Sequence, residues 1–572
     1  MDQVVGFLGG GQLGRMTIEA ANDLNIKCVV LDQGHSPAKQ VLAHAEHVDG
    51  SFKDPASVKK LAEKCTTITV EIEHVDTYVM EEIEKDPNFR AKIEPHWQTI
   101  RTIQNKYNQK LHLHQHGVRT AEFEDLEGKS EEDIKTLGQK WGYPLMLKSK
   151  TEAYDGRGNF PVKSDADILE AMQALGGRPL YAERWANFKA EVAVMVVKAK
   201  NGEFAYPPVE TVHEDSILKL VFAPARNVSK GVLQQAQKLA TKAIGTFKGK
   251  GVYGVEMFLL EDDSLLVNEI APRPHNSGHY TIEGCYMSQF QAHLHAILDL
   301  PIAQEDLELR EPSIMLNILG GETTDSHEKV KMKALHITRK AHIHMYGKGP
   351  ARKGRKMGHI TVTAKTMAQA EALVQPIVDI ADEVRGKPQK WIQLQPSSQS
   401  PTPLVAVIMG SDSDLPKLEA GIRILDKFSI PYEARITSAH RTPVWMAEYA
   451  ESARLRGIKV IISAAGGAAH LPGMAASHTC LPVIGVPIKA SNFDGLDSMF
   501  SIVQMPRGVP VATVGVNNST NAALLAIRIL GVGDPEAWDK TVAFAEQNKN
   551  DVLAKDVRLL EEGALAYLQK MS

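Results

Sequence analysis

Cysteine is scarce in this sequence, with four residues in a chain of 572: Cys28, Cys65, Cys285 and Cys480. Because none lies close to another in the chain, the spacing excludes a zinc knuckle and a CxxC redox pair. Scattered free thiols are typical of proteins that stay in a reducing cytosol. We therefore expect a cytoplasmic protein.

Long hydrophobic runs and an excess of basic charge are also missing. No apolar stretch reaches the roughly 18 residues of a membrane span, and the N-terminal MDQVVGFLGGGQLGRM lacks the layout of a secretory signal. Lys and Arg number 65 against 69 Asp and Glu, a net charge of −4, which gives no bulk field that favours nucleic acid. We expect neither a membrane nor a nucleic-acid partner, so any phosphate binding must come from local sites.

The first segment predicts an α/β unit. A buried strand at 4–8 runs into the glycine-rich Gly9–Gly14, then a helical pattern, then a strand that ends at Asp32. This order is typical of dinucleotide binding, but it also fits a βαβ unit whose glycines only tighten the turn, or one that binds another phosphate. Glu71 and Glu73 follow the next strand, at the edge where open α/β sheets bind ligands.

A second segment begins near residue 105. It predicts a basic helix that carries Lys106 and a strand that ends at Lys148. The TEAYDGRGNF that follows (151–160) contains an Asp-Gly turn signal and glycines that let the backbone approach a ligand, although an ordinary tight turn has the same composition. Later strands and a polar loop contribute Glu183, Glu191 and His213.

Residues 251–279 predict a β-hairpin, with VEMFLL and LLVNEI joined by the polar EDDS. If Leu260 faces Leu265, Glu256 lies opposite Glu269, with Cβ atoms about 5 Å apart. Two facing carboxylates need a cation between them and suit Mg²⁺, which keeps waters and substrate phosphates as its other ligands. A solvated pair at a sheet edge is the alternative.

Polar residues are dense after this hairpin and again near residue 350. Asn268 adds an oxygen ligand, and APRPHNSGH supplies Arg273, His275, Asn276, Ser277 and His279. Residues 311–366 predict a small β-rich segment whose GKGPARKGRKMGH (347–359) fits either a phosphate clamp or a solvated basic loop. The QLQPSSQSPTP at 393–403 is typical of a linker.

The motifs up to about residue 390 resemble one family of ATP-grasp enzymes. GGGQLGRM, AYDGRGNF, NEIAPRPHNSGHYT and GRKMGHI are similar to the synthetases that make N5-carboxyaminoimidazole ribonucleotide from aminoimidazole ribonucleotide, bicarbonate and ATP. The resemblance implies a Rossmann-like domain (1–104), an ATP-grasp domain (105–305) and a small β-rich cap (306–392). It displaces the dinucleotide interpretation, because these enzymes build their first domain on the same βαβ unit.

The same resemblance implies roles for individual residues, with adenine beside the strand at 183–186 and Glu191 on the ribose. It implies an ATP site at Lys106, Lys148, Tyr154, Asp155, Gly156, Arg157, Gly158, Glu183, Glu191, His213 and Asn268. Glu256 and Glu269 would hold Mg²⁺, with Mn²⁺ as the other choice. It implies a substrate site at Gly11, Gln12, Leu13, Glu73, His275, Asn276, Ser277, Lys348 and Arg355, with Arg273 catalytic beside carboxyphosphate.

After the linker a second α/β layer is predicted, with glycine turns at the ends of short parallel strands. GSDSD (410–414) lies between a strand and a helix, where its N–H groups and hydroxyls suit a phosphate or simply cap the helix. SAHRTP (438–443) and GGAAHLPGM (466–474) follow two further strands.

These motifs, with GVPI and SIVQMPRGVPVATV, resemble the aminoimidazole ribonucleotide carboxylase (mutase) family over about 403–550. The resemblance implies a flavodoxin-like domain (404–572) that moves a carboxylate from nitrogen to ring carbon C4, without a cofactor, in a homo-oligomer that is typically octameric. It implies His440 as the catalytic residue, His470 as the second candidate, and a nucleotide site at Ser411, Asp414, Ser438 and Arg441. Ala464 stands where the family usually has glycine, and we expect it not to need a positive φ.

Both halves in one chain resemble the fungal bifunctional carboxylases of purine (IMP) biosynthesis. Two rival functions are a nucleotide sensor without activity and an ATP-grasp ligase that joins an amino acid to an amine. The first is disfavoured because the expected acids, lysines and histidines are all present. The second leaves residues 404–572 unexplained.

Overall fold

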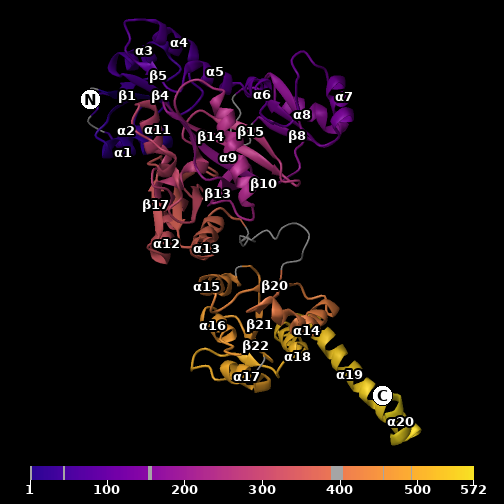
Figure 1. Ribbon diagram of the computed structural model, residues 1–572. Helices are drawn as coiled ribbons and strands as arrows, with labels where there is room; N and C mark the ends of the chain where they lie inside the picture. The colour runs from indigo at the N-terminus through magenta and orange to yellow at the C-terminus, as the bar shows by residue number, and fades with distance from the viewer. Residues whose placement is uncertain are drawn as a thin grey trace. The chain divides into compact units, whose positions relative to one another are not determined.

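The computed structural model describes residues 3–42, 45–151, 158–387, 403–454, 456–490 and 493–571. The chain divides into two compact units, Met1–Trp391 and Ile392–Ser572, and each is described by itself (Figure 1). Within the described ranges, no helix is both long and apolar enough to cross a membrane.

The first unit begins with a parallel sheet in the order β3-β2-β1-β4-β5. β1 and β4 are buried along most of their length, as expected for parallel strands covered on both faces. The strands are β1 (Val4–Leu8), β2 (Lys27–Asp32), β3 (Val48–Asp49), β4 (Thr67–Val70) and β5 (Lys92–Ile93), and the helices are α1 (Gln12–Asp23), α2 (Pro37–Gln40), α3 (Pro55–Lys64), α4 (Thr77–Lys85) and α5 (Trp97–Gln104).

An antiparallel sheet in the order β6-β9-β7-β8 follows. It comprises β6 (Phe123–Asp125), β7 (Leu145–Ser149), β8 (Asn159–Val162) and β9 (Leu180–Arg184), with α6 (Lys106–Gln115), α7 (Glu131–Trp141) and α8 (Ile168–Ala174). Side chains of α7 and α8 pack on this sheet around Leu145, Leu147 and Ala182.

The largest sheet of the first unit runs β15-β14-β10-β12-β13-β16-β18-β17, with β11 paired to β10. Its strands are β10 (Phe188–Ala199), β11 (Gly202–Ala205), β12 (Val209–Glu214), β13 (Ile217–Ala223), β14 (Gly251–Leu260), β15 (Leu265–Ala271), β16 (Ser313–Leu319), β17 (Ala341–Met345) and β18 (Lys356–Thr363). The β-rich segment expected at 311–366 is therefore present, but it extends this sheet instead of forming one of its own.

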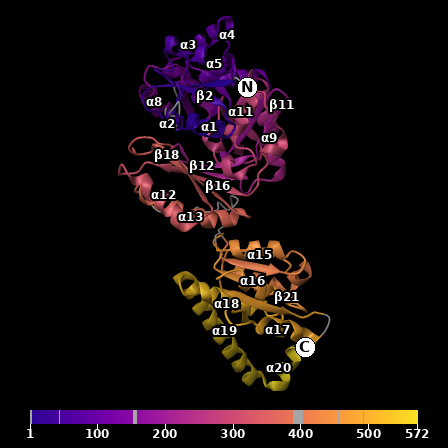
Figure 2. The same ribbon diagram turned by 90° about the vertical axis from the view of Figure 1, so that its left-hand side faces the viewer.

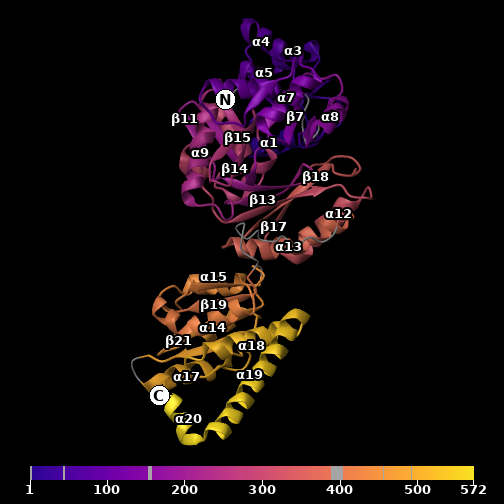
Figure 3. The same cartoon turned by 90° about the vertical axis from the view of Figure 1, so that its right-hand side faces the viewer.

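Helices cover the large sheet and join it to the first one. They are α9 (Lys230–Gly245), α10 (Thr281–Gly284), α11 (Gln289–Ile297), α12 (Ser326–Ile337) and α13 (Met367–Glu383). α11 contacts both α1 and β14, and α12 and α13 pack together against β16 and β18 (Figure 3). The His293 side chain of α11 bonds Thr69 Oγ1 (2.8 Å) and accepts from the Val252 N–H (3.0 Å), so it links the two sheets.

The β14–β15 hairpin corrects one prediction and confirms another. Leu265 faces Leu259 and not Leu260, so the predicted register at the turn is wrong. The pairing then shifts by one residue between Met257–Val267 and Glu256–Glu269, which leaves Asn268 as the extra residue of a β-bulge. The bulge compensates for the register error, and the predicted pairing of Glu256 with Glu269 is confirmed.

The second unit is a parallel sheet in the order β20-β19-β21-β22-β23, the strand order of flavodoxin-like folds. Its elements are β19 (Val405–Met409), α14 (Leu415–Lys427), β20 (Tyr432–Ile436), α15 (Pro443–Ser452), β21 (Val460–Gly466), α16 (Leu471–Ser477), β22 (Val483–Ile488), α17 (Leu496–Val503), β23 (Ala512–Thr513), α18 (Ser519–Gly531), α19 (Pro535–Glu562) and α20 (Ala564–Met571). Helices α14 and α18 cover one face, and α15 and α16 cover the other (Figure 2). Ala464 lies inside β21, paired with Met409 and Val486, in an ordinary strand position.

Candidate active sites

The paired carboxylates of the hairpin are the centre of the first candidate site. Lys106 Nζ lies 3.1 Å from Glu269 Oε2. Lys106 is the first residue of α6, and the side chain of Asn105 caps this helix by accepting from the Asn108 N–H (3.0 Å). Burial and the neighbouring Glu269 raise the pKa of Glu256. Burial also acts to raise the pKa of Glu269, but the Lys106 charge outweighs it and the pKa is lowered.

These carboxylates fit Mg²⁺ or Mn²⁺ better than zinc. In the part of the chain that the structure describes, no group of three or more His, Cys, Asp or Glu side chains is arranged to hold a metal. Two carboxylates with an amide at the bulge are a poor site for zinc but suit an ion that takes its remaining ligands from water and phosphate.

Two lysines share one buried carboxylate beside this hairpin. Glu183 Oε2 lies 2.9 Å from Lys148 Nζ, and Glu183 Oε1 lies 3.1 Å from Lys110 Nζ. Burial opposes ionisation of Glu183, but the two lysines lower its pKa to about 2. Lys110, only 2% exposed, was not predicted from the sequence. Its spacing of four from Lys106, which places both on one helical face, was the available signal.

The other residues expected around ATP are distributed as follows. His213 Nδ1 pairs with Glu191 Oε2, and this contact outweighs burial and raises the pKa of His213. Gly158 adopts φ +85°, a conformation that suits glycine, and its carbonyl accepts from the Ser149 N–H (2.7 Å). Tyr154, Asp155, Gly156 and Arg157 lie outside the described residues.

Glu73 and Arg273 form a two-bond ion pair next to the hairpin. Arg273 Nε lies 2.6 Å from Glu73 Oε2 and Nη2 lies 3.3 Å from Oε1. Burial raises the pKa of Glu73, but the charges of Arg273 and Lys106 outweigh it and hold the pKa far below its usual range. The structure therefore joins a residue expected to bind substrate to one expected to be catalytic.

His275, Ser277 and Asn276 follow Arg273 in a turn at Asn276–Gly278. The His275 Nδ1 atom lies 3.1 Å from Ser277 Oγ, and burial together with Arg273 lowers the pKa of His275 to about 3. The Asn276 side chain instead exchanges two hydrogen bonds with Asn317 of β16, at 2.7 and 3.1 Å, in the interior.

The glycine-rich loop binds the chain's own carboxylates. The Gly10 N–H donates to Asp32 Oδ2 (2.9 Å) and the Gly14 N–H donates to Glu71 Oε2 (3.2 Å). A Cβ on Gly11 would lie 2.0 Å from Glu71 Oε1. Because Glu71 takes the place at the N-terminus of α1 where a pyrophosphate would bind, the dinucleotide interpretation does not fit this loop. Sequence reasoning placed Glu71 at the correct edge of the sheet but not in this role.

The remaining substrate candidates of the first unit meet only in part. Lys348 Nζ donates to Gln12 Oε1 (2.6 Å), which joins the loop at 347–359 to the glycine-rich loop. The Leu13 side chain is buried in the core between α1 and α11. Arg355 Nη1 donates to the Pro350 carbonyl at 3.4 Å, within its own loop.

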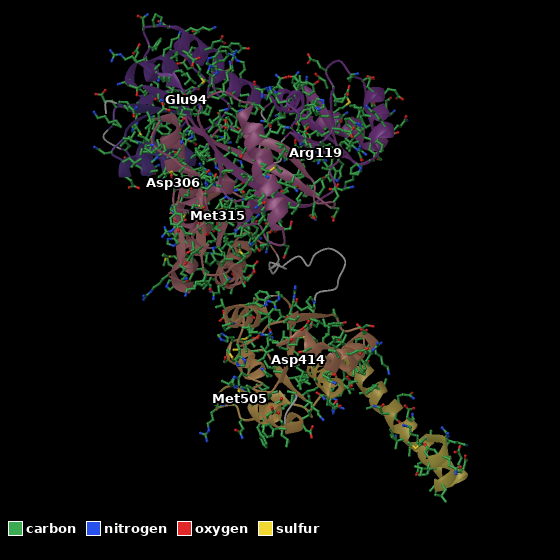
Figure 4. All side chains as sticks on the ribbon, in the orientation of Figure 1. Glu94, Arg119, Asp306, Met315, Asp414 and Met505 are labelled. Carbon is green, nitrogen blue, oxygen red and sulfur yellow. The ribbon has the colours of Figure 1, made fainter. Side chains whose placement is uncertain are left out.

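In the second unit, the predicted nucleotide residues gather at the carboxyl ends of β19 and β20. Arg441 Nη2 donates to the Gly410 carbonyl (2.6 Å) and Nε donates to Ser438 Oγ (3.2 Å). Ser411 and Asp414 lie on the turn ahead of α14, where Figure 4 labels Asp414. Burial raises the pKa of Asp414. This is the edge at which open α/β sheets bind ligands, beside the point where the strand order reverses.

The two histidines proposed for catalysis in the second unit are in contact. His440 Nε2 and His470 Nδ1 lie 2.8 Å apart, and their rings meet edge to face. His440 follows β20 and His470 lies between β21 and α16, so the ends of two strands that flank β19 bring the histidines together across 30 residues. Both side chains are exposed.

Comparison with protein families matches four segments of the chain. Residues 1–104 match the ribonucleotide synthetase preATP-grasp domain, and 111–290 match the ATP-grasp domain. Residues 313–373 match the phosphoribosylaminoimidazole carboxylase C-terminal domain, and 404–551 match AIR carboxylase.

Known relatives cover the whole chain or its first unit. The phosphoribosylaminoimidazole carboxylase of Ogataea methanolica is 53% identical over 538 residues, which are 93% of this chain and 98% of that protein. Two solved structures of carboxyaminoimidazole ribonucleotide synthase from Aspergillus clavatus each align with 67% of this chain and 99% of the solved chain. One is complexed with ATP (60% identity, TM-score 0.65), and the other holds ADP and 5-aminoimidazole ribonucleotide (58% identity, TM-score 0.64).

Proposed function

We infer that this chain, which belongs to the phosphoribosylaminoimidazole carboxylase family, carboxylates aminoimidazole ribonucleotide in two separate sites, one in each unit. It is an enzyme of purine biosynthesis with an ATP-grasp synthetase part and an AIR carboxylase part. The observation that carries the two-site proposal is that each unit has its own cluster of reactive side chains: the facing Glu256 and Glu269 in the first, and the contacting His440 and His470 in the second.

In the first unit, the lysines of α6 and β7 would bind the phosphates of ATP. Lys106 Nζ lies 3.1 Å from Glu269 of the hairpin, and Lys148 Nζ lies 2.9 Å from Glu183 of β9. Glu191 and His213, on neighbouring strands β10 and β12, would hold the ribose. When bound, Mg²⁺ supplies charge neutralisation at the phosphates. Glu256 and Glu269 would hold it, with Asn268 adding an oxygen at the bulge.

Bicarbonate would attack the γ-phosphate of ATP beside Arg273 and His275. Transfer of the phosphoryl group to a bicarbonate oxygen gives carboxyphosphate and ADP. Loss of inorganic phosphate then releases CO₂, which the substrate amine takes up as a carbamate. Arg273 keeps its positive charge because Glu73 and other acids offset its burial. His275 is neutral near pH 7, since its pKa is about 3. The pair thus offers one fixed cation and one uncharged imidazole to an anionic intermediate.

In the second unit, one imidazole would move two protons. The carbamate loses CO₂ as its nitrogen is protonated, the CO₂ then bonds to C4, and the C4 proton is removed. His440 is the proposed acid and base, and its contact with His470 orients the ring. Ser411, Asp414, Ser438 and Arg441 would hold the nucleotide phosphate and sugar.

The second unit is also proposed to assemble the enzyme as a homo-oligomer, an octamer by family resemblance. Helix α19 extends away from its sheet (Figure 1). With α20 it exposes the apolar side chains of Val552, Leu553, Val557, Leu560, Leu565, Leu568 and Met571. Apolar residues at such spacing need cover, and a second copy would supply it. The proposed location is the cytoplasm.

The proposal is tested by the requirements for ADP release. The purified chain is given ATP and Mg²⁺, and ADP is measured with bicarbonate and aminoimidazole ribonucleotide present, then with each omitted. ADP release that needs both supports the synthetase step. ADP release that needs an amino acid instead would favour the rival ligase, and binding of NAD(H) without ATP would contradict the ATP-grasp assignment of the site.

A further inference from the structure

The side chain of Gln289 holds the backbone of His275 from both sides. Gln289 is fully buried at the first position of α11. Its Oε1 accepts from the His275 N–H at 2.9 Å, and its Nε2 donates to the His275 carbonyl at 2.8 Å. These two bonds fix which end of the amide is oxygen, because only oxygen can accept from the backbone N–H.

We call these two hydrogen bonds from Gln289 the clamp. The clamp pairs with the extended backbone of His275, which no neighbouring strand among the described residues does. His275 has φ −124° and ψ 154°, and it lies beyond the end of β15. The paired bonds of the Gln289 amide reproduce the exchange that a neighbouring strand would make. The same Nε2 also donates to His279 Nδ1 at 3.0 Å, so the amide joins both ends of the turn.

The surrounding turn is built around this amide. A Cβ on Gly278 would lie 2.4 Å from Gln289 Oε1, so glycine is needed for the close approach. The Gln289 N–H donates to Thr281 Oγ1 (2.9 Å), and this hydroxyl donates to the Gly278 carbonyl (2.6 Å). The side chain and backbone of Gln289 therefore fix the turn at two points.

What the clamp positions is the His275 imidazole. A Cβ on Gly254 of β14 would lie 2.6 Å from the His275 Cβ, so the histidine is pressed against the strand that carries Glu256. Ser277 Oγ contacts the Nδ1 edge of the ring and donates to Glu256 Oε1 at 3.5 Å, which turns the Nε2 edge away from Ser277. A small movement of the His275 backbone would change where that edge meets a reactant.

We propose that Gln289 is a positioning residue for the bicarbonate step, acting through His275 and not through contact with substrate. The inference rests on the proposed function, because it takes His275 to be beside carboxyphosphate. Displacement of a reacting group by about 1 Å typically costs about 10²-fold in rate. Loss of the clamp should therefore slow bicarbonate-dependent ADP release by about that factor and leave the KM for ATP within about twofold.

The test compares Gln289→Met with Gln291→Met in the full-length chain. Methionine has the length of glutamine but makes none of the three bonds. Gln291 lies in the same helical turn, where its side chain accepts from the Ser288 N–H (3.0 Å) and closes a capping box, so its variant controls for damage to α11. We expect the Gln291 variant within about threefold of wild type. Equal rates for the two variants would overturn the proposal.

A double variant distinguishes positioning from general damage. His275→Asn is measured alone and together with Gln289→Met. If Gln289 acts through His275, the double variant is no slower than His275→Asn. Multiplied losses in the double variant, or a His275→Asn enzyme as fast as wild type, would overturn the inference. If Gln289→Met does not fold, Gln289→Glu replaces it, since it keeps the acceptor for the His275 N–H but sets a carboxylate oxygen against the carbonyl.

The two proposals fail in distinguishable ways. If wild-type ADP release does not need bicarbonate and aminoimidazole ribonucleotide, the proposed function is wrong. If wild type shows both requirements but Gln289→Met matches its Gln291 control, only the positioning role is wrong.

Discussion

The Glu183 carboxylate, which Lys110 and Lys148 share, should stabilise the first unit. Glu183→Gln removes this negative charge. A pKa that falls from 4.5 to about 2 corresponds to about 3 kcal/mol of stability. Because the folded pKa is the lower one, this contribution is complete above about pH 4.5 and is lost as the pH falls toward 2. Removing one partner of a buried ion pair typically costs about 3–5 kcal/mol of stability, and this range agrees with the figure from the pKa.

The expected change in melting temperature follows from the size of the unit. At about 2.1 cal/mol/K per residue, the 391 residues of Met1–Trp391 convert 3 kcal/mol into roughly 4 °C. The assay is thermal unfolding of the full chain at pH 7, followed through the transition that ATP shifts. The stability is lost because the Lys110 charge is left without its partner. The Lys110 side chain is 2% exposed, so its ammonium group cannot be solvated by water instead.

A neighbouring ion pair provides the matched control. Glu122 and Arg184 lie 2.7 Å apart with side chains more than half exposed, so Glu122→Gln should cost less than about 1 kcal/mol. Adding Lys110→Met to Glu183→Gln should recover most of the lost stability, because the buried charge is then gone. A Glu183→Gln protein that melts within 1 °C of the Glu122→Gln protein would refute the reasoning.

Three further predictions concern the hairpin, the glycine-rich loop and the link between the sheets. Glu256→Gln should leave the melting temperature unchanged or raise it, because it removes a carboxylate whose charged form is disfavoured by burial and by Glu269. Mg²⁺-dependent ADP release should fall by at least about 10²-fold. Retained ADP release would contradict the metal role of Glu256. Gly11→Ala should raise the KM for aminoimidazole ribonucleotide but not the KM for ATP. The added Cβ would lie 2.0 Å from Glu71 Oε1 and would displace the glycine-rich loop, which belongs to the implied substrate site. An unchanged KM for aminoimidazole ribonucleotide would contradict the substrate role of this loop. Burial lowers the pKa of His293 from 6.5 to about 3, so the unfolded chain binds a proton there that the folded chain does not. Stability should fall by up to about 1.4 kcal/mol per pH unit below pH 6.5, and His293→Gln should flatten that slope; an unchanged slope would contradict it.

The sequence was sufficient to predict the elements that carry short-range patterns. Strands β1 and β2 with the glycine-rich loop after β1, and the hairpin with its facing carboxylates, depend on short apolar runs and turn signals that lie within a few residues of each other. Family motifs extended this to the strand order of the second unit, which no local pattern specifies.

Contacts between distant segments were not predictable. The bulge at Asn268 depends on pairing across the hairpin, and an apolar run is equally compatible with either register. Glu71 fills the glycine-rich loop only because β4 lies beside β1. Gln289 reads as an ordinary first-turn residue of a helix, and only the fold brings its amide to His275. These three residues make their contacts through tertiary structure, which sequence spacing does not contain.

The central claim is that two separate sites act in sequence, and His440→Asn tests it most directly. The variant is given ATP, bicarbonate and aminoimidazole ribonucleotide, and ADP release and the C4-carboxylated product are measured separately. The account predicts ADP release at the wild-type rate with C4-carboxylation lost. A folded variant that loses ADP release as well, or one that keeps both activities, would contradict it.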